Sequence, residues 1–303
     1  MPNTRGTILR ASLLTLALSS SGIAQTESTP VPRDTAYTWS KKLPDGARFA
    51  IRNLNGGIEI RPGSTDRVEV RAVIRNAANR AVDVGFDVRE HAADDIEICT
   101  TDRGVNACIP EDRWNDAYVN VAITVDLPKG LRILATTGSG YVIVTQLGVE
   151  VDATSGSGDV VVRESLGRVL ANTGSGDVTV AMANGPVRAT TGNGRVLVNT
   201  ALGPVTASSG NGDVEVRMIS VAANVTAPVS TIVSGNGDVR VTLPADFSGE
   251  VDASTGNGAI KSDFQVRASG QTSKTRLRGT IGGGTGAVVK INSGNGRVEI
   301  RKD

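Results

Sequence analysis

Apolar and polar residues alternate along residues 138–209 in a pattern with a constant 18-residue period. Each repeat opens with Gly-Ser-Gly or Gly-Asn-Gly, and apolar residues follow at its fifth, seventh, fourteenth and sixteenth positions. In four consecutive repeats the first three of these positions are always valine and the last is always alanine: Val142, Val144, Val151, Ala153; Val160, Val162, Val169, Ala171; Val178, Val180, Val187, Ala189; and Val196, Val198, Val205, Ala207. This regularity indicates one structural unit per repeat.

Two short β-strands fit into each repeat. The fifth and seventh positions are two residues apart, so their side chains share one face of a strand, and the same holds for the fourteenth and sixteenth. Because the phase returns with every repeat, each unit is expected to stack on the preceding one as a coil, with a rise of about 4.8 Å. We therefore predict an all-β fold, a parallel β-solenoid (β-helix) with 18-residue coils. Serine or asparagine between the paired glycines would stack as a polar ladder: Ser139, Ser157, Ser175, Asn193 and Asn211.

The glycine motif also occurs outside these repeats. It returns at Gly235, Gly256 and Gly294, and residues 55–60 (Asn-Gly-Gly-Ile-Glu-Ile) resemble an earlier copy. The sequence therefore predicts four parts: a signal peptide over residues 1–24, a linker over 25–45, an N-terminal β region with an acidic excursion over 46–135, and the solenoid repeats over 136–303.

Residues 1–24 have the features of a secretory signal peptide. Arg5 and Arg10 supply the positive start, residues 11–18 form a short apolar run, and residues 22–24 (Gly-Ile-Ala) give a small-x-small cleavage site. The alternative is a buried N-terminal helix. We expect an exported protein, located in the periplasm, at the cell surface or in the medium.

Cys99 and Cys108 are the two cysteines of the chain. The segment between them contains Gly104 and Asn106, which suit a hairpin, and an exported chain can oxidise its thiols. Two cysteines without a partner histidine or cysteine at a suitable spacing make a poor zinc site. We therefore predict a disulfide bond, which over such a short loop stabilises the fold by roughly 2–3 kcal/mol.

Charge and aromatic content argue against nucleic-acid binding. The chain has 32 Lys+Arg against 31 Asp+Glu, and its aromatic residues are two Trp, three Tyr and four Phe. Phosphate backbones need a surplus of cations, and single strands need aromatic side chains on which bases stack. No stretch of the sequence reaches the ~18 apolar residues of a membrane span, so none is predicted.

Motifs for catalysis and cofactor binding are not evident in the sequence. The glycine-rich segments lack the pattern of a dinucleotide or phosphate loop, and His91, the single histidine, lies beside Glu90 in a polar stretch. An aspartate follows most glycine corners, as Asp159 and Asp177 do, but Arg195 interrupts this row and calcium-binding β-rolls have a much shorter repeat of their glycine corner. We expect no catalytic residue, no cofactor and no metal site.

Several segments together resemble one bacterial family. They are FAIRNLNGGIEIRPG, VAITVDLPKGLRILATTGSG, DVVVRESLGRVLANTGSGDVTV, SGNGDVRVTLPADFSGEVDASTGNGAIKSDF and the ending GTIGGGTGAVVKINSGNGRVEIRKD. In this order they are similar to the "putative adhesin" family, domain of unknown function 4097, over roughly residues 46–303. The resemblance implies an exported β-solenoid and offers no catalytic residues to transfer.

Residues 76–118 break the repeat and carry ten acidic against four basic side chains. Loops on a rigid scaffold often carry function, so this excursion is the best candidate for a partner contact. The alternative is a solvated loop closed by the disulfide. We expect that deleting residues 90–116 weakens partner binding and leaves the coils folded. The candidate partner-binding residues are Asp94, Asp95, Glu97, Asp102, Glu111, Asp112 and Trp114.

Three functions fit this sequence. The first is a non-enzymatic protein of the cell envelope or surface, a monomeric rod that binds an envelope, surface-protein or polysaccharide partner. A row of outward positions between the core valines offers it a partly apolar contact strip: Ile143, Val161, Thr179, Leu197 and Glu215. The second is a polysaccharide-active enzyme on a β-helix, which needs no histidine if two carboxylates act together. The third is a self-assembling envelope scaffold, against which the charged C-terminus (residues 301–303) argues.

Overall fold

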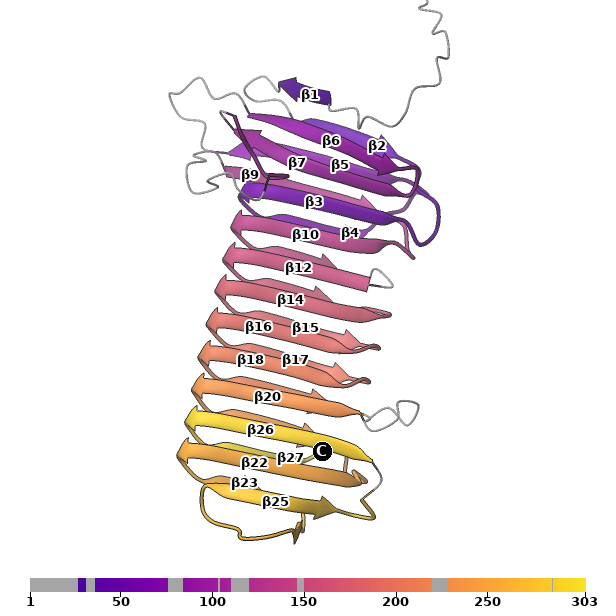
Figure 1. The fold of residues 1–303 in the computed structure, drawn as a ribbon. Coiled ribbons are helices and arrows are strands. Elements are labelled where there is room, and N and C mark those ends of the chain that lie inside the picture. Colours follow the sequence, from indigo (N-terminus) through magenta and orange to yellow (C-terminus); the bar gives the residue numbers. More distant parts are fainter. Residues whose placement is uncertain are drawn as a thin grey trace, which may run out of the picture.

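Two long β-sheets face each other along the molecule and enclose one narrow core (Figure 1). The computed structural model describes residues 27–30, 36–75, 84–102, 104–109, 120–145, 150–219, 228–284 and 286–303. The signal peptide expected over residues 1–24 lies outside the described residues.

The strands of each sheet follow in spatial order. The first sheet contains β1 (Glu27–Pro30), β6 (Val84–Ala92), β7 (Asp95–Asp102), β3 (Arg48–Asn55), β10 (Arg132–Ser139), β12 (Glu150–Ser157), β14 (Arg168–Ser175), β16 (Val187–Asn193), β18 (Val205–Asn211), β20 (Val229–Asn236), β26 (Ala287–Asn295), β22 (Gly249–Asn257), β25 (Arg276–Ile281) and β24 (Arg267–Ala268), with β8 (Val105–Asn106) beside β7. The second contains β2 (Tyr37–Lys41), β5 (Val68–Arg75), β9 (Asn120–Leu127), β4 (Ile58–Pro62), β11 (Val142–Thr145), β13 (Val160–Arg163), β15 (Val178–Ala183), β17 (Val196–Ala201), β19 (Val214–Met218), β21 (Val239–Leu243), β27 (Val298–Lys302) and β23 (Ile260–Ser262).

The parallel register confirms the predicted solenoid with 18-residue coils. Val151 pairs with Val169, and Val169 pairs with Val187, so each valine lies beside the equivalent valine of the next coil. Val151 and Val169 are fully buried. Val142 and Val160 form the same kind of row in the opposite sheet. The core is therefore a stack of small apolar layers, one for each coil.

Glycine is required at the corner where each coil turns from the first sheet into the second. Gly158 has a φ of +134°, a conformation that residues with a side chain rarely adopt. A Cβ atom at Gly158 would also overlap the carbonyl oxygen of Gly140 in the preceding coil. The glycine repeat thus follows from the close contact between stacked backbones.

The stack of coils begins N-terminal to residue 136. Strands β3 and β4 pair in parallel with β10 and β11, so residues 48–62 form a coil of their own. The segment between β4 and β10 adds β5 to β9, and β5 and β6 run antiparallel to their neighbours. The early glycine motif at residues 55–60 is therefore the corner of this first coil.

The linker expected over residues 25–45 contains two strands. β1 pairs antiparallel with β6, and β2 pairs antiparallel with β5. The ring of Tyr37 stacks on Phe86 with 4.0 Å between ring centroids, and Trp39 lies 6.3 Å from Phe49. Aromatic packing therefore holds β2 against the core, a contact that the prolines of this segment did not suggest.

The C-terminal coil is inserted out of sequence order. β26 lies between β20 and β22, and β27 lies between β21 and β23, so the last coil of the chain separates the two coils that precede it (Figure 1). Residues 301–303 consequently lie against inner coils, where Arg217 pairs with Asp303 at 2.7 Å. The charged C-terminus therefore lies inside the stack and does not cover an end of the rod, so it gives no argument against end-to-end assembly.

The hairpin β24–β25 covers the distal end of the rod. β25 pairs antiparallel with β22, and the ring of Phe264 packs edge-on against Phe247 with 6.4 Å between centroids. The backbone of β23 donates a hydrogen bond from Ile260 to the carbonyl of Lys274 at 2.9 Å. In the described part of the chain, no helix is long and apolar enough to cross a membrane.

The phase of the coil predicts opposite effects for one mutation at two sites. Val169 is fully buried between two valine layers, so Val169→Asp places an unpaired carboxylate in the core and should cost several kcal/mol. Arg188 is exposed on the adjoining strand, so Arg188→Asp should leave the melting temperature nearly unchanged. Thermal unfolding followed by circular dichroism measures both, and equal losses would contradict the assignment of inner and outer positions.

The inserted coil predicts an unusual response to truncation. Ending the chain after Gly286 removes β26 and β27, the parallel partners of β22 and β23, so the segment over residues 249–281 should lose amide-exchange protection although it is still present. Ending the chain after Arg301 is the matched control, since it keeps β26 and nearly all of β27 and removes only the last ladder bonds to Leu243 and Asp263 and the exposed Arg217–Asp303 pair, which is worth about 0–1 kcal/mol. Full amide-exchange protection of residues 249–281 in the chain that ends at Gly286 would show that this segment does not need β26 and β27 to fold.

Candidate functional site

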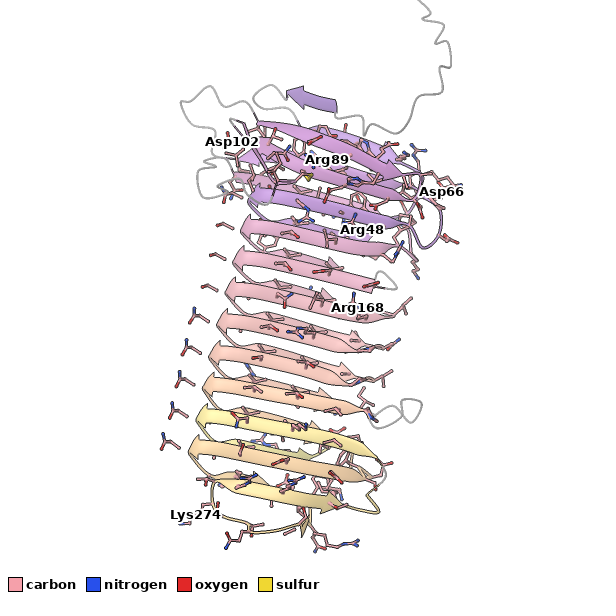
Figure 2. All side chains as sticks on the ribbon, viewed as in Figure 1. Arg48, Asp66, Arg89, Asp102, Arg168 and Lys274 are labelled. Carbon is pink, nitrogen blue, oxygen red and sulfur yellow. A yellow bond between two sulfur atoms is a disulfide. The ribbon has the colours of Figure 1, made fainter. Side chains whose placement is uncertain are left out.

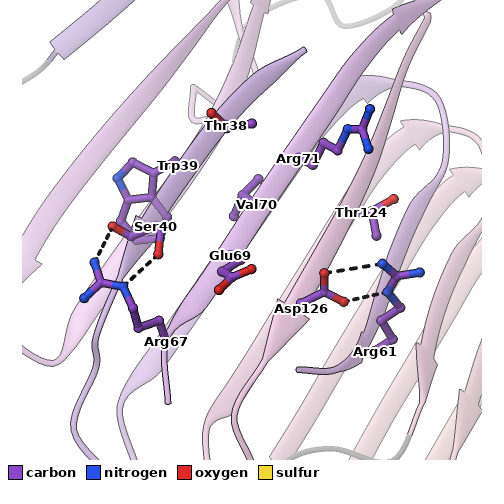
Figure 3. A pocket seen from close by; sticks show the side chains of 10 residues that line it. All are labelled: Thr38, Trp39, Ser40, Arg61, Arg67, Glu69, Val70, Arg71, Thr124 and Asp126. Carbon is purple, nitrogen blue, oxygen red and sulfur yellow. Dashed lines mark hydrogen bonds and ion pairs between the residues drawn. The ribbon is translucent and has the colours of Figure 1, made fainter. Parts of the chain in front are cut away.

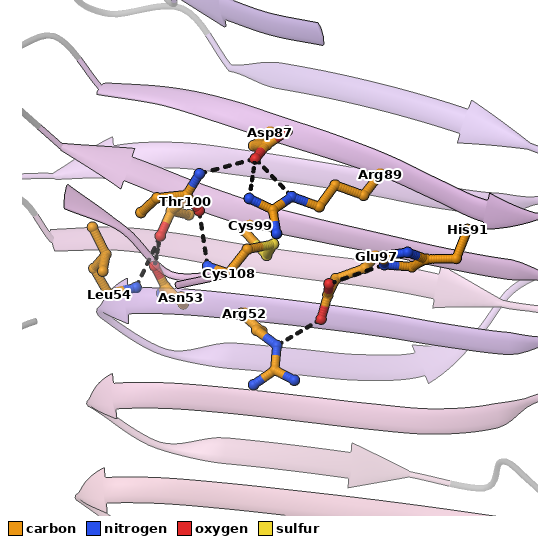
Figure 4. Close-up of a disulfide and its surroundings, with 11 residues drawn as sticks. Arg52, Asn53, Leu54, Asp87, Arg89, His91, Glu97, Cys99, Thr100 and Cys108 are labelled. Atoms are coloured by element: carbon orange, nitrogen blue, oxygen red, sulfur yellow. Dashed lines mark hydrogen bonds and ion pairs between the residues drawn. A yellow bond between two sulfur atoms is a disulfide. The ribbon is translucent and has the colours of Figure 1, made fainter. Parts of the chain in front are cut away.

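The predicted disulfide is present at the N-terminal end of the rod (Figure 4). It joins Cys99 on β7 to Cys108, which follows β8, with 5.5 Å between the Cα atoms. Cys99 is fully buried against Leu54 and Ala107. The bond thus fixes the β8 segment to the outer side of the first sheet.

Two of the predicted partner-binding acids are neutralised within the protein. Asp95 pairs with Arg48 at 2.6 Å, and Glu97 pairs with Arg52 at 2.7 Å. Both arginines lie on β3, which runs parallel to β7, so the pairs tie neighbouring strands together. These carboxylates therefore hold the end of the rod together and do not form an open acidic surface.

Glu97 is the most enclosed of these paired acids. Burial works to raise the pKa of its carboxyl, but hydrogen bonds from Arg52 and His91, together with the charges of Arg52 and Arg48, outweigh burial and lower this pKa below its ordinary value. The His91 ring nitrogen lies 3.3 Å from Glu97 Oε2. Glu97 is consequently held in its ionised form, which suits an ion pair and not a proton donor.

The other predicted site residues fall in different environments. Asp94 is exposed in the turn between β6 and β7, whereas Asp102 is buried at the end of β7. Glu111, Asp112 and Trp114 lie outside the described residues. The structure therefore does not bring the described candidates together into one open surface.

The acidic excursion is also less separable than its sequence suggests. β7 pairs with β3 on one side and with β6 on the other, and it contributes Ile96 and Ile98 to the core. Deleting residues 90–116 would remove this strand from the sheet. We therefore expect this deletion to disturb the coil that contains β3 as well as any partner contact.

Asp87 is a buried acid that the sequence analysis did not single out. Its Oδ2 atom accepts hydrogen bonds from Arg89 and from Asn106, both at 2.9 Å, and so links β6 to β8. Asp87 and Arg89 are two residues apart on β6 and so lie on the same face of the strand. This spacing is the feature of the sequence that could have predicted their ion pair. Its role is to hold the disulfide-closed segment in place.

The polar rows along the coils are used within the stack. Asp159 accepts a hydrogen bond from the backbone nitrogen of Asp177 at 2.9 Å, and Asp177 accepts one from the backbone of Arg195 at 2.7 Å. The predicted polar ladder is confirmed where Asn211 donates to Asn193 at 2.9 Å. Figure 2 shows a column of side chains along the left edge of the rod. These carboxylates and amides stabilise neighbouring coils, which gives the aspartate row a structural role.

A groove lies on the outer face of the second sheet, at its N-terminal end (Figure 3). Its volume is about 620 Å³. We call it the N-terminal groove, and its lining side chains come from or adjoin β2, β4, β5 and β9: Thr38, Trp39, Ser40, Arg61, Arg67, Glu69, Val70, Arg71, Thr124 and Asp126. The groove is not evident from the sequence, because its residues come together from separate segments of the chain.

The three arginines of the groove differ in how they are paired. Arg61 binds both carboxylate oxygens of Asp126, at 2.5 and 3.3 Å. Arg67 donates to the hydroxyl and the carbonyl oxygen of Ser40, at 2.9 and 3.1 Å, and has no carboxylate partner among the described residues. The side chain of Arg71 makes no ion pair or hydrogen bond with any residue that the structure describes, although its backbone pairs with β2 and β9. The groove therefore presents two arginines whose charge is not neutralised by a bound carboxylate.

Residues 48–301 match the Toastrack DUF4097 family, a range that includes the coils and the groove strands β4, β5 and β9 but not β2. The chain belongs to this family. A search with this chain finds no match among curated proteins.

Two solved structures are similar to this Toastrack protein. One is a "putative adhesin" from Bacteroides fragilis NCTC 9343, with 13% sequence identity, a TM-score of 0.41, and coverage of 89% of this chain and 98% of the other. The second is a "putative cell adhesion protein" from Clostridium sporogenes ATCC 15579, also 13% identical, with a TM-score of 0.27 and coverage of 92% and 100%.

The Glu97 ion pair predicts a specific acid sensitivity. Because the folded protein lowers the pKa of Glu97 below its ordinary value of 4.5, the pair stabilises the fold above that pH, and the contribution is lost as the pH falls through the lower folded value. Glu97→Gln should lower stability at neutral pH by about 1–3 kcal/mol. It should also flatten the fall in melting temperature below about pH 4.5.

Asp94→Asn is the matched control, since Asp94 is an exposed acid in the adjoining turn. Differential scanning calorimetry over a series of acidic buffers compares the two variants with the parent chain. An unchanged acid profile for Glu97→Gln would show that another group governs the loss of stability.

Proposed function

We propose that this protein is an exported, non-enzymatic binding protein of the cell envelope or surface. The solenoid serves as a rigid spacer, and the N-terminal groove is the contact site for a partner. The observation that carries this proposal is a difference between the acidic and the basic side chains. Carboxylates along β7 and at the coil corners bind groups within the protein. Arg67 and Arg71, in contrast, face the groove without a bound carboxylate.

Export is supported by the leader-like segment over residues 1–24 and by the disulfide. Disulfides persist in oxidising compartments, and Cys99–Cys108 closes the segment next to the groove-bearing end of the rod. The periplasm, the cell surface and the medium all provide such conditions.

Binding without turnover is supported by the state of the acids. Hydrolysis of a polysaccharide by two carboxylates requires one of them to be a proton donor with a raised pKa. Burial raises the pKa of Asp152, but Glu150, the acid nearest to it in the chain, is bound to Arg168 and is not a free second carboxylate. Glu97 has a lowered pKa and is bound to Arg52, and Asp126 in the groove is bound to Arg61. These environments favour permanent ion pairs.

A monomeric rod is supported by both ends of the stack. At the distal end β25 pairs antiparallel with β22, and at the N-terminal end β2 and β1 run antiparallel to the strands beneath them. Antiparallel closing strands interrupt the parallel pairing that would let a second molecule extend the coils.

The groove continues into the outward strip that the sequence analysis identified. Thr124 in the groove lies in register with Glu59, which is followed along the sheet by Ile143, Val161 and Thr179. An extended partner that enters the groove can therefore lie along the side of the rod.

The proposed function predicts saturable binding to the envelope of the producing cell. Purified exported protein should bind isolated envelopes with an affinity that falls as salt rises, because Arg67 and Arg71 are exposed to solvent. The double variant Arg67→Gln/Arg71→Gln should bind at least about tenfold more weakly, which is a loss of about 1.4 kcal/mol. Sedimentation of labelled protein with the envelopes measures this.

Assays of the same purified protein distinguish the two alternative functions. Steady release of new reducing ends or unsaturated products from anionic polysaccharides would establish the enzyme. A mass that rises with concentration in analytical ultracentrifugation would establish the self-assembling scaffold. Either result, or envelope binding that does not saturate, would refute the proposed function.

A further inference from the structure

The order of charges across the N-terminal groove restricts what it can bind. On β5 and the turn before it, Arg67, Glu69 and Arg71 are spaced two residues apart, so all three face outward from the same side of the sheet. Arg67 and Arg71 are therefore about 14 Å apart along the backbone, at ~3.4 Å per residue. Glu69 lies between them. Its Oε1 atom accepts a hydrogen bond from the hydroxyl of Thr65 at 3.0 Å, and no salt bridge within the described chain joins Glu69 to either arginine.

This order disfavours a small compact anion at the centre of the groove. Glu69 would repel phosphate or a single carboxylate there, because like charges in close contact are unfavourable. A ligand that places a hydrogen-bond donor over Glu69 and an anionic group over each arginine would satisfy all three side chains. The pattern is anion, hydroxyl, anion along one extended molecule.

Hydroxyl groups flank this row on both neighbouring strands. Thr38 and Thr124 lie directly opposite Arg71, and Ser40 lies opposite Glu69. Residues that face each other in this way have Cβ atoms about 4.5–5.5 Å apart, within reach of one ligand. A hydroxyl both donates and accepts a hydrogen bond, as the hydroxyls of a sugar do.

The remaining charged pair closes one side of the groove. Arg61 and Asp126 bind each other through two hydrogen bonds, which leaves little net charge there. Figure 3 shows this pair on the far side of Glu69 from Arg67 and Ser40. The open positive charge of the groove thus belongs to Arg67 and Arg71.

Resting on the proposed function, we infer that the N-terminal groove binds a carboxylate-bearing saccharide chain, with Arg67 and Arg71 each holding a uronate carboxylate and Glu69 accepting a hydrogen bond from a sugar hydroxyl between them. Guanidinium groups bind carboxylates through charge-assisted hydrogen bonds. The outward row from Thr124 through Glu59 to Ile143 provides the path along which further sugar units leave the groove.

The inference is tested by calorimetric titration of the full exported chain with a galacturonate oligosaccharide of four units. The comparison ligands are a neutral galactose oligosaccharide of the same length, an oligo-glutamate of the same charge, and inorganic phosphate. We expect the galacturonate oligosaccharide to bind at least tenfold more tightly than the other three, and its affinity to fall with salt.

Single substitutions separate the role of each side chain. Arg67→Gln and Arg71→Gln should each weaken galacturonate binding about tenfold or more. Glu69→Gln should weaken it less, because an amide oxygen still accepts a hydrogen bond, and should strengthen phosphate binding by removing the central negative charge. Arg188→Gln is the control: it removes one exposed arginine from the other sheet and should leave binding unchanged. Equal melting temperatures of the variants would establish that the fold is intact.

Three results would overturn the inference. They are equal binding by Arg71→Gln and Arg188→Gln, oligo-glutamate or phosphate binding as tightly as galacturonate, and no galacturonate binding at all. The envelope assay distinguishes these failures from a failure of the proposed function. Envelope binding that still depends on Arg67 and Arg71 would keep the groove as the contact site and exclude only the saccharide class.

Discussion

The close contact between backbones at the glycine corners determines the rest of the structure. The amide nitrogen of Gly158 donates to the carbonyl of Ser175 in the next coil at 2.7 Å, and equivalent bonds recur from coil to coil. A Cβ atom at Gly158 would overlap the carbonyl oxygen of Gly140 in the preceding coil, so the backbones fit together at this corner only when the residue is glycine. This contact sets the register of each coil, and the register in turn places valine beside valine in the core and asparagine beside asparagine at the edge. Stability is consequently shared among neighbouring coils and does not reside in any one of them.

The sequence predicted the coil well because its phase is repeated many times. Val169 could be assigned to the interior from the 18-residue period alone, and the Asn193–Asn211 contact followed from the same alignment. The position of β26 could not be predicted in this way, because its glycine motif at Gly294 looks like that of any other coil and carries no information on its neighbours. The order of coils in space depends on which strand edges are still unpaired when each coil docks, and the repeated sequence motif does not encode this.

The candidate site was harder to predict, for a different reason. Arg52 and Glu97 are far apart in the chain, so their ion pair is invisible until β3 and β7 are known to be neighbours. Counting charges along residues 76–118 therefore suggested an acidic surface where the folded protein has paired charges. The N-terminal groove depends on the same kind of long-range assembly, with Ser40, Arg67 and Asp126 coming from separate segments. Local sequence therefore predicts the structure of the coils, but it does not predict contacts between strands that are far apart in the chain.

The insertion of the last coil has a consequence for the order in which the chain can fold. From β10 to β21 each coil stacks on a coil that precedes it in the chain, so these coils can form while the rest of the chain is still being synthesised. The coil of β22 and β23 must wait, because its neighbours β26 and β27 follow it in the chain. A chain cut short in synthesis or by a protease would leave the edges of β20 and β22 unpaired, and unpaired edges invite degradation and aggregation. Only molecules that contain β26 and β27 can therefore complete the rod. Residues 287–303 thus distinguish full-length chains, which close the stack, from truncated chains, which do not.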